Sequence, residues 1–237
     1  MTATDMNGGA TWGVGSVIGT AASIMGGHFV PFVGTALVGS VPSLLFKLVL
    51  PDSHIQGIVD LIIGQVVTVM LIYGTVQALR GRQVSVGECL SDGLKRLGPA
   101  IGVALIAGIG IAIGMVLLVV PGLILATIWA VAIPSAVVER TGVFASLSRS
   151  VDLTRERRWR SFGAILVAGL ITIVIAAVIG GLAVVIGGVQ SVSFAVVLWA
   201  ITAISQAFSA CVVATLYYNL RREKEGVGIE QIAQVFD

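Results

Sequence analysis

Charged residues are scarce in this 237-residue chain, which carries 14 Lys and Arg and 12 Asp and Glu, or 11% of its residues. A soluble domain carries about 25%. Apolar residues make up 57% of the chain. This combination excludes a soluble globular fold, a disordered chain and a coiled coil. The chain is therefore predicted to be an integral membrane protein.

Cysteine and histidine are also rare, with two residues of each. Cys89 lies in a polar connecting segment and Cys211 in an apolar run, so neither a disulfide framework nor a metal cluster is expected. His28 and His54 have no second ligand at metal-binding spacing. No nucleophile with a base, no paired carboxylates and no phosphate loop is recognisable. We therefore expect neither an enzyme nor a bound cofactor.

The apolar stretches are long and show no strand-like alternation, so helices rather than barrel strands are expected to span the membrane. Turn-forming residues at 51–54, 121–122 and 187–193 divide these stretches into hairpins. The predicted spans are residues 30–50, 58–79, 99–120, 122–138, 162–186 and 194–220. Residues 1–15 contain no Lys or Arg, so the first span is expected to target the chain. The predicted fold is an all-α polytopic membrane protein, with three hairpins in one domain over residues 1–237.

The cations fall on one side of this topology. Thirteen of the 14 Lys and Arg follow the second, fourth or sixth span, and only Lys47 lies near the other side. The positive-inside rule then places both termini in the cytoplasm. The net charge of +2 is not a nucleic-acid signal. The basic loops are interpreted as facing anionic phospholipids.

Three connecting segments have the pattern of amphipathic helices. Apolar residues recur at offsets of 0, 4, 8 and 11 from Val14, Val86 and Val143, and Ser85 with Glu88 forms a capping box. We expect these segments to lie on the membrane surface as interfacial helices. They are residues 12–26, 85–97 and 142–158. Each precedes a hairpin, and the unequal spacing of the three units leaves a true repeat open.

Residues 121–159 resemble the membrane domain found in some bacterial glycerophosphoryl diester phosphodiesterases and in stand-alone inner-membrane proteins of uncertain role. In that family a Pro-Gly hairpin precedes an apolar helix, a Pro, a Glu and an Ala-Leu-x-x-Ser-x-x-Leu-Thr surface helix that ends near a Trp. The matching positions are Pro121, Gly122, Pro134, Glu139, Ala145, Leu147, Ser150, Leu153, Thr154 and Trp159. Residues 217–230 resemble the family's Tyr-Tyr-Asp-Leu-Arg ending, with Asn219 in place of the usual Asp.

This resemblance covers the second half of the chain well and the first half only by layout. It implies a six-helix protein of the bacterial cytoplasmic (inner) membrane with a lipid or envelope role. The phosphodiesterase activity is not carried over, because in those proteins it resides in a separate soluble barrel.

Two groups of polar residues are candidate sites. Asp60 is either an interfacial carboxylate paired with Lys47 or a proton or cation site. Gln65 and Gln206 lie deeper and need hydrogen-bond partners or a water-filled space.

The second group lies at the cytoplasmic end of the fourth span. It comprises Glu139, Arg149, Arg155, Arg158, Tyr217 and Arg221. In a structural interpretation Glu139 pairs with Arg149 or Arg221 and pins the surface helix to the bundle, with Tyr217 beside it. In a functional interpretation the arginines bind the phosphate of a lipid headgroup.

Three functions are compatible with these features. The preferred hypothesis is a non-catalytic protein of phospholipid or envelope homeostasis that binds membrane phospholipids through its basic surface helices. The second is a structural or accessory subunit of a larger membrane complex, or a homo-oligomer, supported by small residues such as Gly110, Gly114, Ala203 and Ala207. The third is a small channel or transporter, in which Asp60 would face a cavity shared with Gln65.

Overall fold

The computed structural model describes residues 12–50, 54–187 and 192–226. In this part of the chain every regular element is an α-helix, which confirms the predicted all-α class. The helices are α1 (Val14–Gly27), α2 (Phe29–Val49), α3 (Gln56–Leu79), α4 (Val86–Leu94), α5 (Leu97–Leu117), α6 (Val119–Ile128), α7 (Ala132–Glu139), α8 (Val143–Thr154), α9 (Arg158–Gly187) and α10 (Val192–Glu225).

Six helical segments are long and apolar enough to cross a membrane, which makes the chain a multi-pass membrane protein. They are Phe29–Val49, Gln56–Leu79, Leu97–Leu117, Val119–Glu139, Arg158–Val185 and Val196–Glu225. Each overlaps one predicted span. The predicted turns at 51–54 and 187–193 fall mostly on 51–53 and 188–191, which lie outside the described residues.

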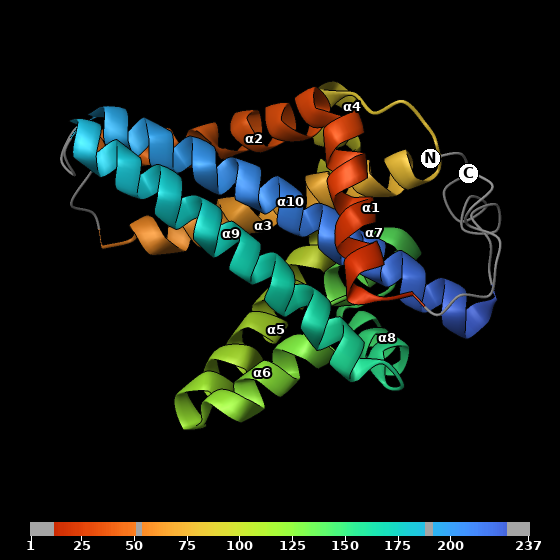
Figure 1. Ribbon diagram of the computed structural model, residues 1–237. Helices are drawn as coiled ribbons and strands as arrows, with labels where there is room; N and C mark the ends of the chain where they lie inside the picture. Colours follow the sequence, from red (N-terminus) through yellow and green to blue (C-terminus); the bar gives the residue numbers. More distant parts are fainter. Residues whose placement is uncertain (1–11, 51–53, 188–191, 227–237) are drawn as a thin grey trace.

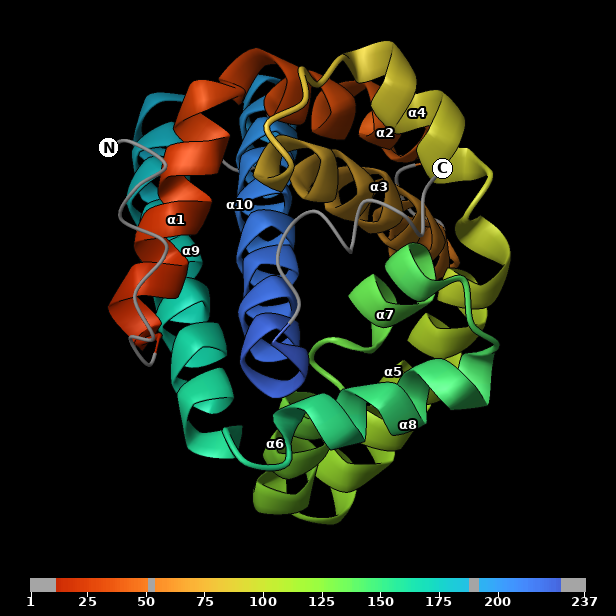
Figure 2. The ribbon, with the colours of Figure 1, turned by 90° about the vertical axis from the view of Figure 1, so that its right-hand side faces the viewer.

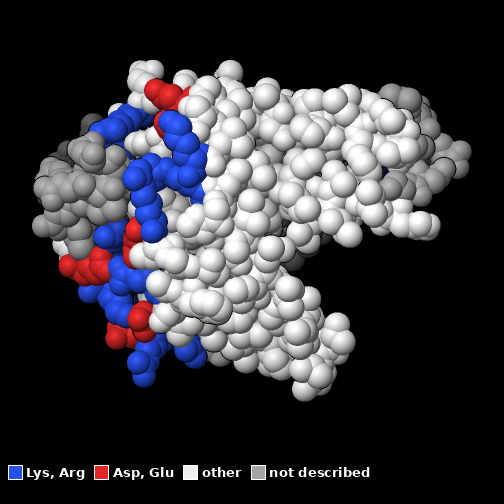
Figure 3. Space-filling view, turned by 180° about the vertical axis from the view of Figure 1, so that it is seen from behind, with Lys and Arg blue, Asp and Glu red and all other residues white. Residues whose placement is uncertain are grey.

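Helix α10 is the centre of the molecule and packs against α1, α2, α3, α7, α8 and α9. The hairpin of α9 and α10 lies beside the hairpin of α2 and α3, whereas the hairpin of α5 and α6 points away from both (Figure 1). A notch separates the α5–α6 hairpin from the rest of the molecule in the space-filling view (Figure 3). The apolar part of the molecule therefore consists of two groups of helices, α2, α3, α9 and α10 in one and α5 and α6 in the other, which meet at one end.

The second hairpin turns earlier than predicted. The turn lies at Leu118, and both Pro121 and Gly122 belong to α6. Proline is tolerated there because the N–H groups of a first helical turn have no intrahelical partner to lose. A Cβ on Gly122 would lie 2.5 Å from Cγ of Met115, so glycine at this position allows α5 and α6 to touch.

The fourth predicted span is not one helix, because α6 ends at Ile128 and α7 begins at Ala132. The intervening Trp-Ala-Val contains neither Gly nor Pro, so the sequence shows no breaker there. Hydroxyl groups of α8 satisfy the backbone freed by the break. Ser150 Oγ donates a hydrogen bond of 2.7 Å to the Ile128 carbonyl, and Thr154 Oγ1 lies 3.4 Å from the same oxygen. The Ser and Thr of the surface-helix motif therefore hold a broken spanning helix.

Helices α1, α4 and α8 lie across one end of the bundle, around the end of α10 (Figure 2). They occupy the three segments predicted to be interfacial, although α4 and α8 end at Leu94 and Thr154, earlier than predicted. The Ser85 cap is confirmed, because its hydroxyl accepts a hydrogen bond of 3.2 Å from the Glu88 N–H.

The predicted apolar stripes of α1 and α4 match the packed faces only in part, since Val14, Ile18 and Met25 pack against the core while other members do not. Helix α1 buries Val17, Ala21 and Met25, and Ala22 is exposed. Helix α4 buries Cys89 and Gly93, while Leu94 is exposed. Small residues allow a surface helix to approach its neighbour closely, and large apolar residues beside a membrane can face lipid instead. Hydrophobicity alone therefore does not identify the packed face of such a helix.

The small residues considered for contacts between chains pack within this chain. A Cβ on Gly110 would lie 2.5 Å from the Trp129 ring, and one on Gly114 would lie 2.9 Å from Cα of Gly122. Ala203 and Ala207 of α10 are buried. These close approaches form the α5–α6 hairpin and the centre of the bundle.

Acidic and basic side chains gather at the end of the molecule where α4, α8 and the end of α10 meet (Figure 3). We refer to this part as the charged end. Contacts join the connections here: Arg96 donates to the Val137 carbonyl at 2.9 Å, and Trp12 Nε1 donates to Glu223 at 2.8 Å. This arrangement confirms the prediction that the cations of the second connection, the fourth connection and the end of the last span lie on one side of the molecule.

Candidate functional site

Glu139, the last residue of α7, is the centre of a closed network of charges. Its carboxylate accepts hydrogen bonds of 3.0 and 3.2 Å from Arg149 Nε of α8. It also accepts a bond of 2.7 Å from the hydroxyl of Tyr217 on α10. The Glu139 and Arg149 side chains are 16% and 25% exposed, so the pair is largely shielded from solvent. It joins three helices, as the structural interpretation predicts.

Arg221 belongs to the same network but has a different acidic partner from the one considered. Its Nε donates to Glu225 at 2.8 Å, and its Nη1 donates to the Tyr217 hydroxyl at 3.2 Å. Glu225 also pairs with Nη2 of Arg149. We call Glu139, Arg149, Tyr217, Arg221 and Glu225 the closed cluster. Two arginines face two carboxylates in it, so it has no excess charge with which to bind an anion.

Arg155 and Arg158 are not part of the closed cluster. Both are exposed, and neither has an ion pair within the described residues. Their neighbour Arg157 is bound instead, with Nε 2.9 Å from Glu223 Oε1. This hydrogen bond raises the pKa of Arg157. The six residues considered together in the sequence thus separate into four members of the closed cluster and a solvent-facing pair of arginines.

Asp60 and Gln65 have different surroundings in the described structure. Asp60 is exposed and accepts hydrogen bonds from Ser43 and, at 2.8 Å, from Gln56. The expected pairing with Lys47 is not among the ion pairs of the described residues. Gln65 Oε1 is buried and has no partner there, whereas Gln206 donates to the Gly64 carbonyl at 2.5 Å. Gln206 therefore makes the predicted helix-to-helix bond, and the geometry gives Asp60 a local structural role.

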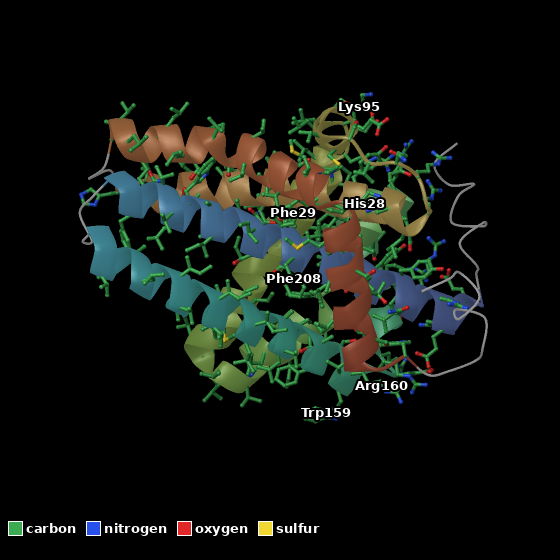
Figure 4. The ribbon with its side chains drawn as sticks, turned by 45° about the horizontal axis from the view of Figure 1, so that its top comes forward. His28, Phe29, Lys95, Trp159, Arg160 and Phe208 are labelled. Carbon is green, nitrogen blue, oxygen red and sulfur yellow. The ribbon has the colours of Figure 1, made fainter. Side chains whose placement is uncertain are left out.

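A cavity of about 490 Å³ opens at the charged end, where α3, α4, α5 and α7 meet. Its lining includes four cationic side chains and one carboxylate, a net formal charge of +3. These residues are Arg82, Lys95, Arg96, Arg140 and Asp92. We call the cavity lined by these residues the basic cavity. Lys95 lies on the opposite side of the charged end from Trp159 and Arg160 (Figure 4).

Aromatic and amide groups of α3 form another part of this lining. The Arg96 guanidinium carbon lies 4.8 Å from the centre of the Tyr73 ring, a cation–π contact. The Tyr73 hydroxyl accepts a hydrogen bond of 2.8 Å from Gln77 and lies 3.4 Å from Asp92. Lys95 Nζ lies 2.7 Å from Asp92, and its hydrogen bond lowers the pKa of that carboxyl group. The carboxylate that the described residues contribute to the cavity is therefore already paired with Lys95.

Arg140 follows the last residue of α7 and has a left-handed backbone conformation, with φ 51° and ψ 30°. Within the described residues it is the only non-glycine residue with positive φ. This conformation costs about 1 kcal/mol for a residue with a Cβ. Burial and the charge of Arg140 both lower the pKa of Arg96, which indicates that the two cations repel each other. Arg140 makes no hydrogen bond or ion pair within the described residues.

The basic cavity was missed in the sequence because its members come from two different connections. Arg82, Lys95 and Arg96 follow the second span, and Arg140 follows the fourth. Only the packing of α5 and α7 against α3 brings them together. No family model, curated protein or solved structure matches this chain in comparisons with known proteins. The described residues also contain no group of three or more His, Cys, Asp or Glu that could hold a metal ion.

Proposed function

We propose that this protein is a non-catalytic protein of the bacterial inner membrane that binds anionic phospholipid at its charged end and acts in phospholipid or envelope homeostasis. In this proposal the charged end and both termini lie in the cytoplasm, as the positive-inside rule favours. The resemblance of residues 121–159 to the membrane domain of glycerophosphoryl diester phosphodiesterases supports a lipid-related role. The six apolar spans support the proposal because they are those of a multi-pass membrane protein.

The observation that carries the proposal is the combination of exposed aromatic and cationic side chains along α8 and the start of α9. Phe144 is 76% exposed and Trp159 is 86% exposed. Arg155 and Arg158 are exposed in the same stretch of chain. Aromatic rings at the membrane boundary and arginines facing anionic headgroups are typical of lipid contact. Each such cation near an anionic surface contributes about 1 kcal/mol.

The two other functions have less support. The accessory-subunit hypothesis rests on small residues that pack within the chain, as described for Gly110 and Gly114. The channel or transporter hypothesis rests on Asp60 and Gln65 facing one cavity, and the basic cavity is lined by neither. Lipid binding remains the function that the described geometry supports best.

The proposal is tested by counting the phospholipids that stay bound to the protein after extraction in a mild detergent. We expect the double variant Arg155→Gln, Arg158→Gln to retain fewer molecules of phosphatidylglycerol in native mass spectrometry, with retention of phosphatidylethanolamine unchanged. Lys47→Gln, which removes an exposed cation near the far end of α2, serves as the control. Equal retention of phosphatidylglycerol by the double variant and the unmodified protein would contradict the proposal.

A further inference from the structure

The hairpin of α5 and α6 differs from the other two hairpins in the residues at its turn. Side chains with a nitrogen or oxygen atom are absent from residues 97–126, which include all of α5 and most of α6. By contrast, Asp52 and His54 lie between α2 and α3, and Gln190 and Ser191 lie between α9 and α10. Turns that face water are usually rich in such polar residues. The α5–α6 turn therefore lacks the composition of a turn that emerges from a membrane.

The residues of this turn are also exposed. We refer to five consecutive residues as the apolar tip: Val116, Leu117, Leu118, Val119 and Val120. Their exposed fractions range from 62% to 87%. The part of the hairpin that is visible in Figure 3 carries no charged side chain. An exposed apolar patch is unfavourable in water and marks a contact with lipid or with another protein.

The length of α6 limits how far the apolar tip lies from the charged end. Helix α6 ends at Ile128, whose carbonyl accepts the 2.7 Å hydrogen bond from Ser150 of α8. Helix α8 carries Arg149 and the exposed Asp152. Charged side chains are costly inside the hydrocarbon core, so Ile128 lies near the boundary of that core. From there the 10 residues of α6 extend about 15 Å, which is half of a core about 30 Å thick.

Helix α5 limits the depth of the tip in the same way. A Cβ on Gly102 would lie 2.6 Å from Cγ2 of Val143, the first residue of α8. Residues 102–117 then extend about 22 Å along the axis of α5. The hairpin is inclined to α2, α9 and α10, so its depth along their direction is smaller (Figure 1). By comparison, the 30 residues of α9 extend about 45 Å. Measured from α8, both helices of the α5–α6 hairpin are therefore too short to reach the far side of the membrane.

The turn itself leaves few backbone groups free. It consists of the single residue Leu118, whose N–H donates to the Gly114 carbonyl at 3.1 Å. The Gly122 N–H lies 3.5 Å from the Leu118 carbonyl, and Pro121 has no N–H. Unsatisfied backbone groups are costly in hydrocarbon. A turn this short is therefore better suited to the bilayer interior than a longer loop.

From the absence of polar residues and the short reach we propose that the α5–α6 hairpin is re-entrant. It enters the bilayer from the charged end, turns inside the hydrocarbon core and returns to the same end, so the apolar tip is a contact surface for lipid acyl chains. The notch beside the hairpin then opens to the bilayer interior (Figure 3). This inference is independent of the proposed function, because none of its observations concerns Arg155, Arg158 or the binding of a headgroup.

The experiment measures the surroundings of a spin label on Val119→Cys in the full-length protein, reconstituted in vesicles of phosphatidylethanolamine and phosphatidylglycerol. Electron paramagnetic resonance compares collisions of the label with molecular oxygen, which concentrates in hydrocarbon, and with a nickel chelate, which stays in water. The matched controls are Ile173→Cys, which lies midway along α9 and is 64% exposed, and His54→Cys, which lies just before α3 and is exposed. The unmodified protein is the blank, because both native cysteines are buried.

We expect residue 119 to behave as residue 173 does, with more oxygen collisions and fewer nickel collisions than residue 54. Val116→Cys, at the most exposed position of the apolar tip, should give the same result and guards against one variant that fails to fold. Nickel collisions at residue 119 as frequent as those at residue 54 would place the tip in water. Infrequent collisions with both reagents would show that a second copy of the chain or another protein covers the tip. Either of these last two results would overturn the proposal.

Discussion

The closed cluster and the basic cavity lie at the same end of the molecule and are both rich in arginine, yet they differ in what those arginines face. Arg149 and Arg221 are paired with Glu139 and Glu225 across α7, α8 and α10. In the described lining of the cavity between α3, α4, α5 and α7, the one carboxylate, Asp92, is paired with Lys95. Paired charges fix helices relative to one another and leave no excess charge with which to bind an anion. The number of cations in a segment is therefore a poor guide to a binding site.

The largest expected effect concerns the closed cluster. Glu139→Gln removes the charge that holds Arg149 and weakens the acceptor for Tyr217, so we expect a loss of about 2 kcal/mol in the free energy of unfolding. Thermal unfolding in detergent measures it, with the exposed Glu156→Gln of the same end as the control. A variant as stable as the control would show that the cluster does not hold the helices together.

The second prediction concerns the wall of the basic cavity. A Cβ on Gly93 would lie 2.8 Å from Cα of Met70, so Gly93→Ala must push α4 away from α3. We expect a loss of about 1–2 kcal/mol in stability from this overpacking. Gly87→Ala on the same helix has open space around it and should leave the stability unchanged. Identical melting temperatures for the two variants would contradict the close packing of α3 and α4.

The comparison also predicts a change that stabilises the protein. Arg140→Gly removes both the left-handed strain and the repulsion with Arg96, so we expect stability to increase by about 1 kcal/mol. The melting temperature in detergent measures this gain. A lower melting temperature would indicate that Arg140 has an attractive partner in the native protein.

The smallest expected effect is the loss of one exposed ion pair. Asp92→Asn removes the carboxylate that the described residues contribute to the cavity lining, so stability should fall by about 0.5 kcal/mol, as expected for one partly exposed charge paired with Lys95. Thermal unfolding at low ionic strength measures it, and replacement of the exposed Asp152 of α8, Asp152→Asn, is the control. A loss as large as that of Glu139→Gln would contradict the difference between the two groups of charges.

The pH dependence of this carboxylate has a defined sign. The hydrogen bond from Lys95 lowers the pKa of Asp92 below its ordinary value of 3.8. Its contribution to stability is therefore present above the unfolded-state pKa and is lost as the pH falls through the lower native value. We expect the Asp92 charge to persist at neutral and mildly acidic pH.

The sequence predicted the spanning helices well because long uncharged runs report membrane burial directly. The sequence did not predict the features that depend on contacts between helices. At the break at 129–131, the Ser150 hydroxyl of α8 donates a hydrogen bond to the Ile128 carbonyl. No local sequence pattern predicts this contact, because the two residues lie in different helices. Hydrophobicity did not identify every packed residue of α1 and α4, because a large apolar side chain is stable both against lipid and against protein.

The candidate site was also predicted only in part, because some of its contacts join residues that are distant in the sequence. The pairing of Glu139 with Arg149 was one of the two alternatives considered, and the two residues lie only ten positions apart in one connection. The basic cavity joins Arg96 to Arg140, which lie in different connections and approach each other only through α5 and α7. Cationic residues that are distant in the sequence but close in the structure cannot be recognised from residue spacing or periodicity.

The most direct test of the account is a crystal structure of the protein grown with tungstate, a heavy analogue of phosphate whose anomalous scattering locates it unambiguously. We predict no anomalous peak beside Arg149 or Arg221. Tungstate bound at the closed cluster would contradict the claim that arginines paired with carboxylates hold helices together rather than bind anions.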